Sequence, residues 1–276
     1  MGTSHLALVN PMSKSNELQL HIHQLEEIRS ILNAMKNLAL MAVHKFTQLQ
    51  SFQTQVVTHI EESSAVFFAA YPHFIMDSNH EPVYLIFGSE RGFCGDFNEH
   101  LLDSLKNQPC GGIIAVGNRL IASVENDNYN VIASLNGINV VEEVLPLLEQ
   151  LMIQIKTFAY DGKLIAVYHD LTSNEVKQRQ ILPLSLPVNT KEATPFLNLS
   201  PDLFFSKILE QYLVAVLYEV IYLSSLSENR LRLQHLEGAV QHLDEQTQKL
   251  HRKSQIFRQE EITEEIEVIL LNIETF

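Results

Sequence analysis

Two long stretches of this chain almost completely lack proline and glycine. No proline follows Pro201, and Gly238 is the only glycine after that point. A second stretch, from Asn16 to Tyr71, contains neither residue and ends at Pro72. Because proline and glycine are the residues that most disfavour a helix interior, each stretch is free to form one long helix.

Cysteine and basic residues are also scarce. The two cysteines, Cys94 and Cys110, give no disulfide framework, so we expect a reducing compartment. Lys and Arg number 19 against 33 Asp and Glu, and the resulting net charge of −14 argues against nucleic acid or an anionic membrane surface as a partner. The N-terminal region has no basic segment followed by a long apolar core, so we expect no signal peptide.

No apolar run is long enough to cross a membrane. The most apolar window, Tyr212 to Leu226, is short and is interrupted by Glu219. We therefore expect a buried helix there and no direct membrane insertion.

Apolar residues recur at alternating steps of three and four in both long stretches, as in a coiled coil. In the C-terminal stretch, which begins with the helix-start signal Ser200-Pro201-Asp202, they include Leu209, Leu213, Val216, Val220, Leu233, Leu236, Val240 and Leu243. In the N-terminal stretch they include Leu18, Ile22, Leu25, Leu32, Met35, Ala39 and Phe46. The two helices are expected to pair as an antiparallel coiled coil. The spacing slips between Phe257 and Ile262, where we expect the C-terminal helix to leave its partner.

The middle of the chain has a different pattern. Short apolar runs predict strands at 83–87, 112–116, 131–134, 163–169 and 176–184, and helices are predicted at 94–106, 118–126 and 142–158. This alternation is typical of a mostly parallel α/β sheet inserted between the long helices. The expected division is residues 1–80, which begin with a loose arm to Ser15, then an inserted α/β domain at 81–200, then 201–276.

The loop Gly88–Asp96 follows the first predicted strand, where α/β proteins often hold phosphate. It has neither a Gly-Lys-Ser/Thr ending nor a Gly-x-Gly-x-x-Gly spacing, and Glu90 and Asp96 would repel an anion. We interpret it as a tight turn. Cys94 is a candidate nucleophile at a helix start, but a packed small side chain is the simpler interpretation.

The histidines lack partners at metal-ligand spacing. His21 and His23 point to different sides of a helix, whereas His235 and His242 share a face without cysteine or carboxylate ligands nearby. We therefore predict no metal, no cofactor and no catalytic residues.

Four segments together resemble one family. Ile31–Ala39 (ILNAMKNLA) resembles the Ile-Thr-Lys-Ala-Met-x-Met-Val-Ala segment of the gamma subunits of F-type ATP synthases, and Ser89–Asn98 (SERGFCGDFN) resembles their Ser-Asp-Arg-Gly-Leu-Cys-Gly-Gly-Leu-Asn. Near the C-terminus, Arg258–Ile266 (RQEEITEEI) resembles Arg-Gln-x-x-Ile-Thr-x-Glu-Leu. The pattern Glu-x-x-x-Arg-Met-x-x-Met-x-x-Ala is matched by Glu228, Arg232, Leu233, Leu236 and Ala239.

The resemblance implies an antiparallel coiled coil of the two terminal helices with an inserted Rossmann-like α/β domain. It also implies a non-catalytic central rotor shaft inside a ring of alpha and beta subunits, with a foot that binds the epsilon subunit and the c-subunit membrane ring. The complex would place the chain peripherally at the cytoplasmic face of a membrane and couple ion transport, by protons or another ion, to ATP synthesis or hydrolysis.

By motif, the resemblance assigns contacts with the catalytic ring to Met35, Lys36, Arg232, Arg258, Gln259 and Thr263. The chain departs from the family in its acidity, and Asn33 stands where the family has lysine. These departures predict a divergent gamma subunit. A non-rotary coiled-coil scaffold or adaptor of a related complex stays open as the alternative.

Overall fold

The computed structural model describes residues 14–74, 81–106, 108–126, 129–158, 162–170, 175–184 and 196–274. The chain forms two compact units, one made of Met1–Asn37 with Leu236–Phe276 and the other of Leu38–His235. The predicted N-terminal arm consists largely of residues 1–13, which lie outside the described residues. The predicted domain boundary at residue 80 lies within 75–80, which are also outside them. The three-part division by chain order therefore stays a prediction.

Both long helices are confirmed. Helix α1 covers Lys14–Ala70 and α5 covers Pro201–Glu274. At the start of α5 the Phe204 amide donates to the Ser200 carbonyl at 2.9 Å. Helix α1 ends just before Pro72, which begins the short 3-10 helix η1 (Pro72–Phe74), because proline has no amide proton to continue the helical ladder.

The two helices pair antiparallel in the first unit. Leu32 of α1 lies in one buried cluster with Leu236 and Val240 of α5. Arg29 forms an ion pair with Asp244, and Glu26 lies 3.7 Å from the His251 ring. The residue numbers of the contacts on α5 thus increase as those on α1 decrease. This confirms the predicted antiparallel coiled coil.

The second unit contains a five-stranded sheet. Its strands are β1 (Val83–Phe87), β2 (Gly112–Val116), β3 (Val131–Leu135), β4 (Leu164–His169) and β5 (Val176–Leu182), in the order β3-β2-β1-β4-β5. The first four strands run parallel, and β5 pairs with β4 antiparallel at the edge. This confirms the mostly parallel sheet expected from the apolar runs.

Three shorter helices connect the strands: α2 (Phe97–Asp103), α3 (Asn118–Asn126) and α4 (Val144–Phe158), with the 3-10 helix η2 (Val141–Glu143) before α4. The prediction that α2 begins at Cys94 was wrong. Phe93 and Gly95 have φ angles of 66° and 57°, and these left-handed conformations keep residues up to Asp96 out of the helix.

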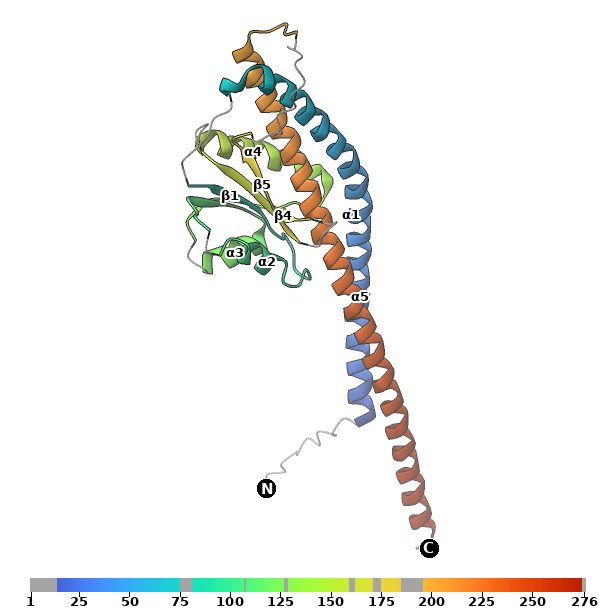
Figure 1. Cartoon of the computed structure of the whole chain (residues 1–276). Coiled ribbons are helices and arrows are strands. Elements are labelled where there is room, and N and C mark those ends of the chain that lie inside the picture. The colour runs from blue at the N-terminus through green and yellow to red at the C-terminus, as the bar shows by residue number, and fades with distance from the viewer. Residues whose placement is uncertain are drawn as a thin grey trace, which may run out of the picture. The chain divides into compact units, whose positions relative to one another are not determined.

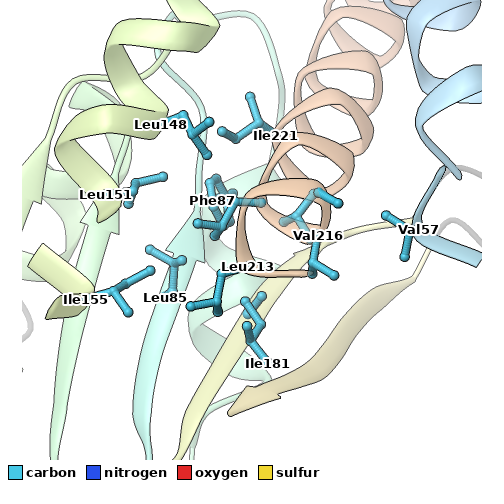
Figure 2. Packing of buried hydrophobic residues seen from close by; sticks show 14 of the residues in the cluster. Val57, Leu85, Phe87, Leu148, Leu151, Ile155, Ile181, Leu213, Val216 and Ile221 are labelled. Atoms are coloured by element: carbon cyan, nitrogen blue, oxygen red, sulfur yellow. The ribbon is translucent and has the colours of Figure 1, made fainter. Parts of the chain in front are cut away.

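Alternate residues of the central strands enter opposite cores. Tyr84, Ile86 and Ile113 pack with α2 and α3, whereas Leu85 and Phe87 pack with α4, α5 and the part of α1 in this unit. In Figure 1, α4 and α5 lie on one side of the sheet and α2 and α3 on the other. Figure 2 shows the α4–α5 side, where side chains from both sheet and helices point toward one another.

The apolar window Tyr212–Leu226 forms part of this core, as expected of a buried helix. Val216, Leu217 and Val220 are fully buried, and Glu219 is also buried. None of the described helices is long and apolar enough to cross a membrane.

Candidate functional site

The loop Gly88–Asp96, here the β1–α2 loop, lies at the carboxyl end of β1. Its first turn is closed by hydrogen bonds with Asn98, which accepts from the Ser89 amide and donates to the Ser89 hydroxyl, both at 2.9 Å. An added Cβ at Gly95 would lie 2.6 Å from Nε2 of His235, so only glycine permits this close approach to α5.

Glu228 of α5 binds the backbone of this loop. One oxygen, Oε1, accepts hydrogen bonds from the Glu90 amide at 3.1 Å and the Arg91 amide at 3.3 Å. The same oxygen pairs with Arg232, one helical turn later. With Glu228 only 4% exposed and Arg232 only 6%, the Glu228–Arg232 pair is an internal contact.

Arg232 completes the attachment of the loop. Its Nε donates to the Gly92 carbonyl at 3.1 Å, and Nη2 donates to the Arg91 carbonyl at 3.4 Å. Its Nη1 donates to Oδ1 of Asn229 at 2.8 Å. The loop therefore presents both amides and carbonyls to complementary charges on α5, which fixes its conformation.

The two places where an α/β loop commonly binds phosphate are filled by this chain's own carboxylates. The amides of Glu90 and Arg91 are taken by Glu228. At the start of α3, the Glu90 carboxylate accepts from the Asn118 amide at 3.0 Å and from the Gly137 amide at 2.7 Å. A phosphate would have to displace a bound carboxylate at either place.

Cys94 is a packed thiol. It is 5% exposed, and its Sγ lies 3.3 Å from Nη2 of Arg232. Burial, and secondarily the negative charge of Glu228, raises the pKa of Cys94 to about 12. At neutral pH the group is a thiol and lacks the thiolate that a nucleophile needs.

Two serines of α5 were not identified from the sequence. The Ser224 hydroxyl donates to the carbonyl of Phe87, and Ser227 donates to the carbonyl of His169, both at 3.0 Å. These carbonyls end β1 and β4, so the serines attach α5 to the carboxyl edge of the sheet. The sequence feature that could have identified them is their spacing of three residues, which places both on one face of a buried apolar helix.

His169 is a further buried titratable group at this edge. Its Nε2 lies 2.8 Å from the Phe97 carbonyl oxygen, and its ring is tilted by 32° against the Phe97 ring, with centroids 4.0 Å apart. Burial lowers the pKa of His169, which keeps the ring neutral. In the part of the chain that the structure describes, no group of three or more His, Cys, Asp or Glu side chains is arranged to hold a metal ion.

The six residues predicted to contact the ring lie in different settings. Met35 and Lys36 are half-buried in the first unit, where Met35 packs against Leu32 and Leu236. Arg258, Gln259 and Thr263 are exposed along less than two turns of α5. Arg258 lines a groove with Gln19 and Ile22, well along α1 from Met35.

Arg232, the sixth, is buried against the β1–α2 loop in the second unit. Its charge is thus used within the chain, which the motif alone did not indicate.

Beyond the groove, α5 carries uncovered apolar side chains. Ser254 is the last buried residue among those described on this helix. Ile262, Ile266 and Ile269 are 49%, 51% and 57% exposed. The sequence slip after Phe257 therefore coincides with the end of the buried seam. Apolar residues so exposed are typical of a surface that meets a partner.

Comparison with known proteins agrees with this architecture. A family model described as ATP synthase matches residues 14–274. The chain is 25% identical to the ATP synthase gamma chain of Clostridium beijerinckii, over 92% of this chain and 95% of that one. It is also 25% identical to the gamma chain of Clostridium botulinum strain Langeland over 218 residues, 72% of this chain and 77% of that one.

Solved structures share the fold. The rotor of Euglena gracilis mitochondrial ATP synthase superposes with a TM-score of 0.62 at 15% identity, covering 90% of this chain and 98% of that one. A chain of the central stalk and c-ring of Tetrahymena thermophila mitochondrial ATP synthase gives a TM-score of 0.55 at 19% identity, covering 76% and 99%.

Proposed function

The chain belongs to the ATP synthase family as a divergent gamma subunit, and we propose that it is the central rotor shaft of an F-type ATP synthase or ATPase. The observation that carries this proposal is the family match across residues 14–274, which spans both long helices and the sheet between them. The chain is a non-catalytic subunit. Glu228 occupies backbone amides of the β1–α2 loop, and Glu90 occupies the Gly137 amide. This agrees with a non-catalytic role, because a nucleotide phosphate would have to displace these carboxylates.

The shaft works by transmitting torque. A stiff, asymmetric helix pair presents a different surface to each of the otherwise identical catalytic subunits that surround it, and so stabilises a different conformation in each. Rotation passes these conformations around the ring. Differential contacts of this kind are what any shift of conformational populations requires.

The motifs assign the ring contacts to residues of both long helices. Arg258, Gln259 and Thr263 would meet the catalytic subunits at the opening of the ring, and their exposure supports this assignment. Met35 and Lys36 would contact a catalytic subunit from α1. Arg232 would act indirectly, by holding the β1–α2 loop in the conformation that a partner meets.

The inserted α/β domain would form the foot, which binds the epsilon subunit and the c-subunit ring. The Tetrahymena relative comes from a central stalk with its c-ring, which supports this placement. The chain would then lie peripherally at the cytoplasmic face of a membrane, attached through the complex.

Co-expression with alpha and beta subunits from the same genome tests the proposal. Purification through a tag on beta should yield a complex with ATPase activity that contains one copy of this chain. Omitting the chain is the control and should abolish that complex. Failure to associate would favour a non-rotary scaffold, and ATP hydrolysis by the purified chain alone would overturn the non-catalytic assignment.

A further inference from the structure

One half-buried arginine, Arg179, joins the edge of the sheet to both long helices within the second unit. Arg179 lies on β5 opposite Ala166 of β4, two residues from Ile181, whose side chain enters the core beneath α5. Because directly paired residues of neighbouring strands share a face, Arg179 projects toward the same side as Ala166, whose side chain lies in this core. This places its guanidinium where α1 and α5 pass over the sheet edge.

The guanidinium binds a carboxylate on each helix. Nη1 lies 2.6 Å from Oε2 of Glu219 on α5, and Nη2 lies 2.6 Å from Oε1 of Glu61 on α1. The side chain of Glu219 is 7% exposed, that of Arg179 is 23% exposed and that of Glu61 is 34% exposed. The Arg179–Glu219 pair is therefore largely shielded from water, whereas the Glu61 carboxylate is partly exposed.

Further hydrogen bonds connect the two helices at the same level. The Thr54 hydroxyl of α1 donates to Oε1 of Glu219 at 2.8 Å, and the Gln53 amide donates to the Ala215 carbonyl of α5 at 2.8 Å. Glu219 thus uses one oxygen for the strand and the other for α1. The result is one polar junction of α1, α5 and β5.

The junction differs in kind from the apolar packing around it. Apolar contacts are non-directional, so the side chains can slide against one another at small cost. Charge-assisted hydrogen bonds from a planar guanidinium are directional and lose strength when the partner shifts. At the β5 edge a shearing force between helices and sheet is therefore resisted by the Arg179 junction, whereas Ser224 and Ser227 attach α5 at the ends of β1 and β4.

We propose that Arg179 is a positioning residue for torque transmission, locking the helix pair to the sheet edge through Glu61 and Glu219 so that rotation of one turns the other. This inference rests on the proposed rotor function. None of the three residues lies in the four sequence segments that resemble the gamma subunits.

The test uses the assembled complex in membrane vesicles and measures both ATP hydrolysis and ATP-driven ion pumping. Arg179→Met keeps an unbranched apolar stem but removes both ion pairs, and Arg179→Lys keeps the charge but not the two-armed geometry. Lys207→Met is the matched control, since it removes a cation from an exposed ion pair with Glu210 in the same unit.

We expect Arg179→Met to hydrolyse ATP at the rate of the unmodified complex while pumping fewer ions per ATP, with Arg179→Lys in between and Lys207→Met unchanged. Hydrogen exchange of the β5 amides should rise on the order of tenfold or more in Arg179→Met, because a charged hydrogen bond is lost. Unchanged pumping per ATP in Arg179→Met would overturn the proposal, even if its thermal stability fell.

If the complex with Arg179→Met fails to assemble, the Glu61→Gln variant tests the proposal instead. It weakens only the contact between Arg179 and α1 and leaves the Arg179–Glu219 pair in place. Reduced pumping per ATP in that variant supports the proposal, and pumping equal to the unmodified complex refutes it. Failure of the unmodified complex to assemble or pump would instead refute the rotor function itself.

Discussion

Replacing Arg232 by methionine leaves the carboxylate of Glu228 buried without its charged partner. Glu228 would keep only the two backbone donors of Glu90 and Arg91. Removing one partner of a buried ion pair costs about 3–5 kcal/mol of unfolding free energy. Replacing Glu228 by glutamine in the same chain removes the unpaired charge, so the double variant should recover much of this loss.

The loss should depend on pH with a definite sign. Burial raises the pKa of Glu228, while Arg232 acts in the opposite direction. A carboxyl group with a raised pKa in the folded state stabilises the fold below its unfolded pKa, about 4.3, and that stability is lost as the pH rises through the folded pKa. Without Arg232 the folded pKa is higher still, so the deficit relative to the unmodified chain grows from acid to neutral pH.

Urea unfolding of the full chain, followed by circular dichroism near pH 5 and pH 8, measures this deficit. Hydrogen exchange of the Glu90 and Arg91 amides reports separately whether the loop has opened. A deficit that is the same at both pH values would refute the reasoning. So would a double variant, Glu228→Gln with Arg232→Met, that is no more stable than Arg232→Met alone.

Further predictions concern glycines, thiols and the exposed part of α5. Gly238→Ala should raise the unfolding free energy by about 1 kcal/mol, because no atom lies within 4 Å of the added Cβ. Gly95→Ala should lower it, because Gly95 has a positive φ and the added Cβ would clash with His235. Thermal unfolding measures both variants, and a shift of both melting temperatures in the same direction would contradict this. Alkylation at pH 8 followed by mass spectrometry should modify Cys110 well before Cys94, since the buried Cys94 thiol has a pKa of about 12, and equal rates would refute that burial. Replacing Arg258 and Gln259 together by alanine should weaken coupling or assembly without changing the helix content of the isolated chain, and normal coupled activity would argue against the assigned ring contact.

Most elements of the fold were predictable from local sequence. The strand Gly112–Val116 and the helix Asn118–Asn126 have their predicted bounds, because an apolar run and a turn residue mark each end. The long helices were equally predictable from the sequence, since no residue within them strongly disfavours a helix. The start of α2 was not, because the left-handed backbone at Phe93 is set by the packing of the loop.

The contacts that define the site were not predictable in the same way. Glu228 and Arg232 are spaced like a surface ion pair on a helix, and only the arrival of a loop about 140 residues earlier buries them. Arg179 and Glu61 are likewise 118 residues apart. Such pairings depend on the tertiary arrangement, which residue spacing alone does not specify.

Rotation of this chain inside an immobilised ring of alpha and beta subunits is the direct test of the proposed rotor function. With a probe attached to the inserted α/β domain and ATP supplied, we expect rotation in one direction with equally spaced pauses, one for each catalytic subunit of the ring. A complex that hydrolyses ATP while the probe stays fixed would contradict it.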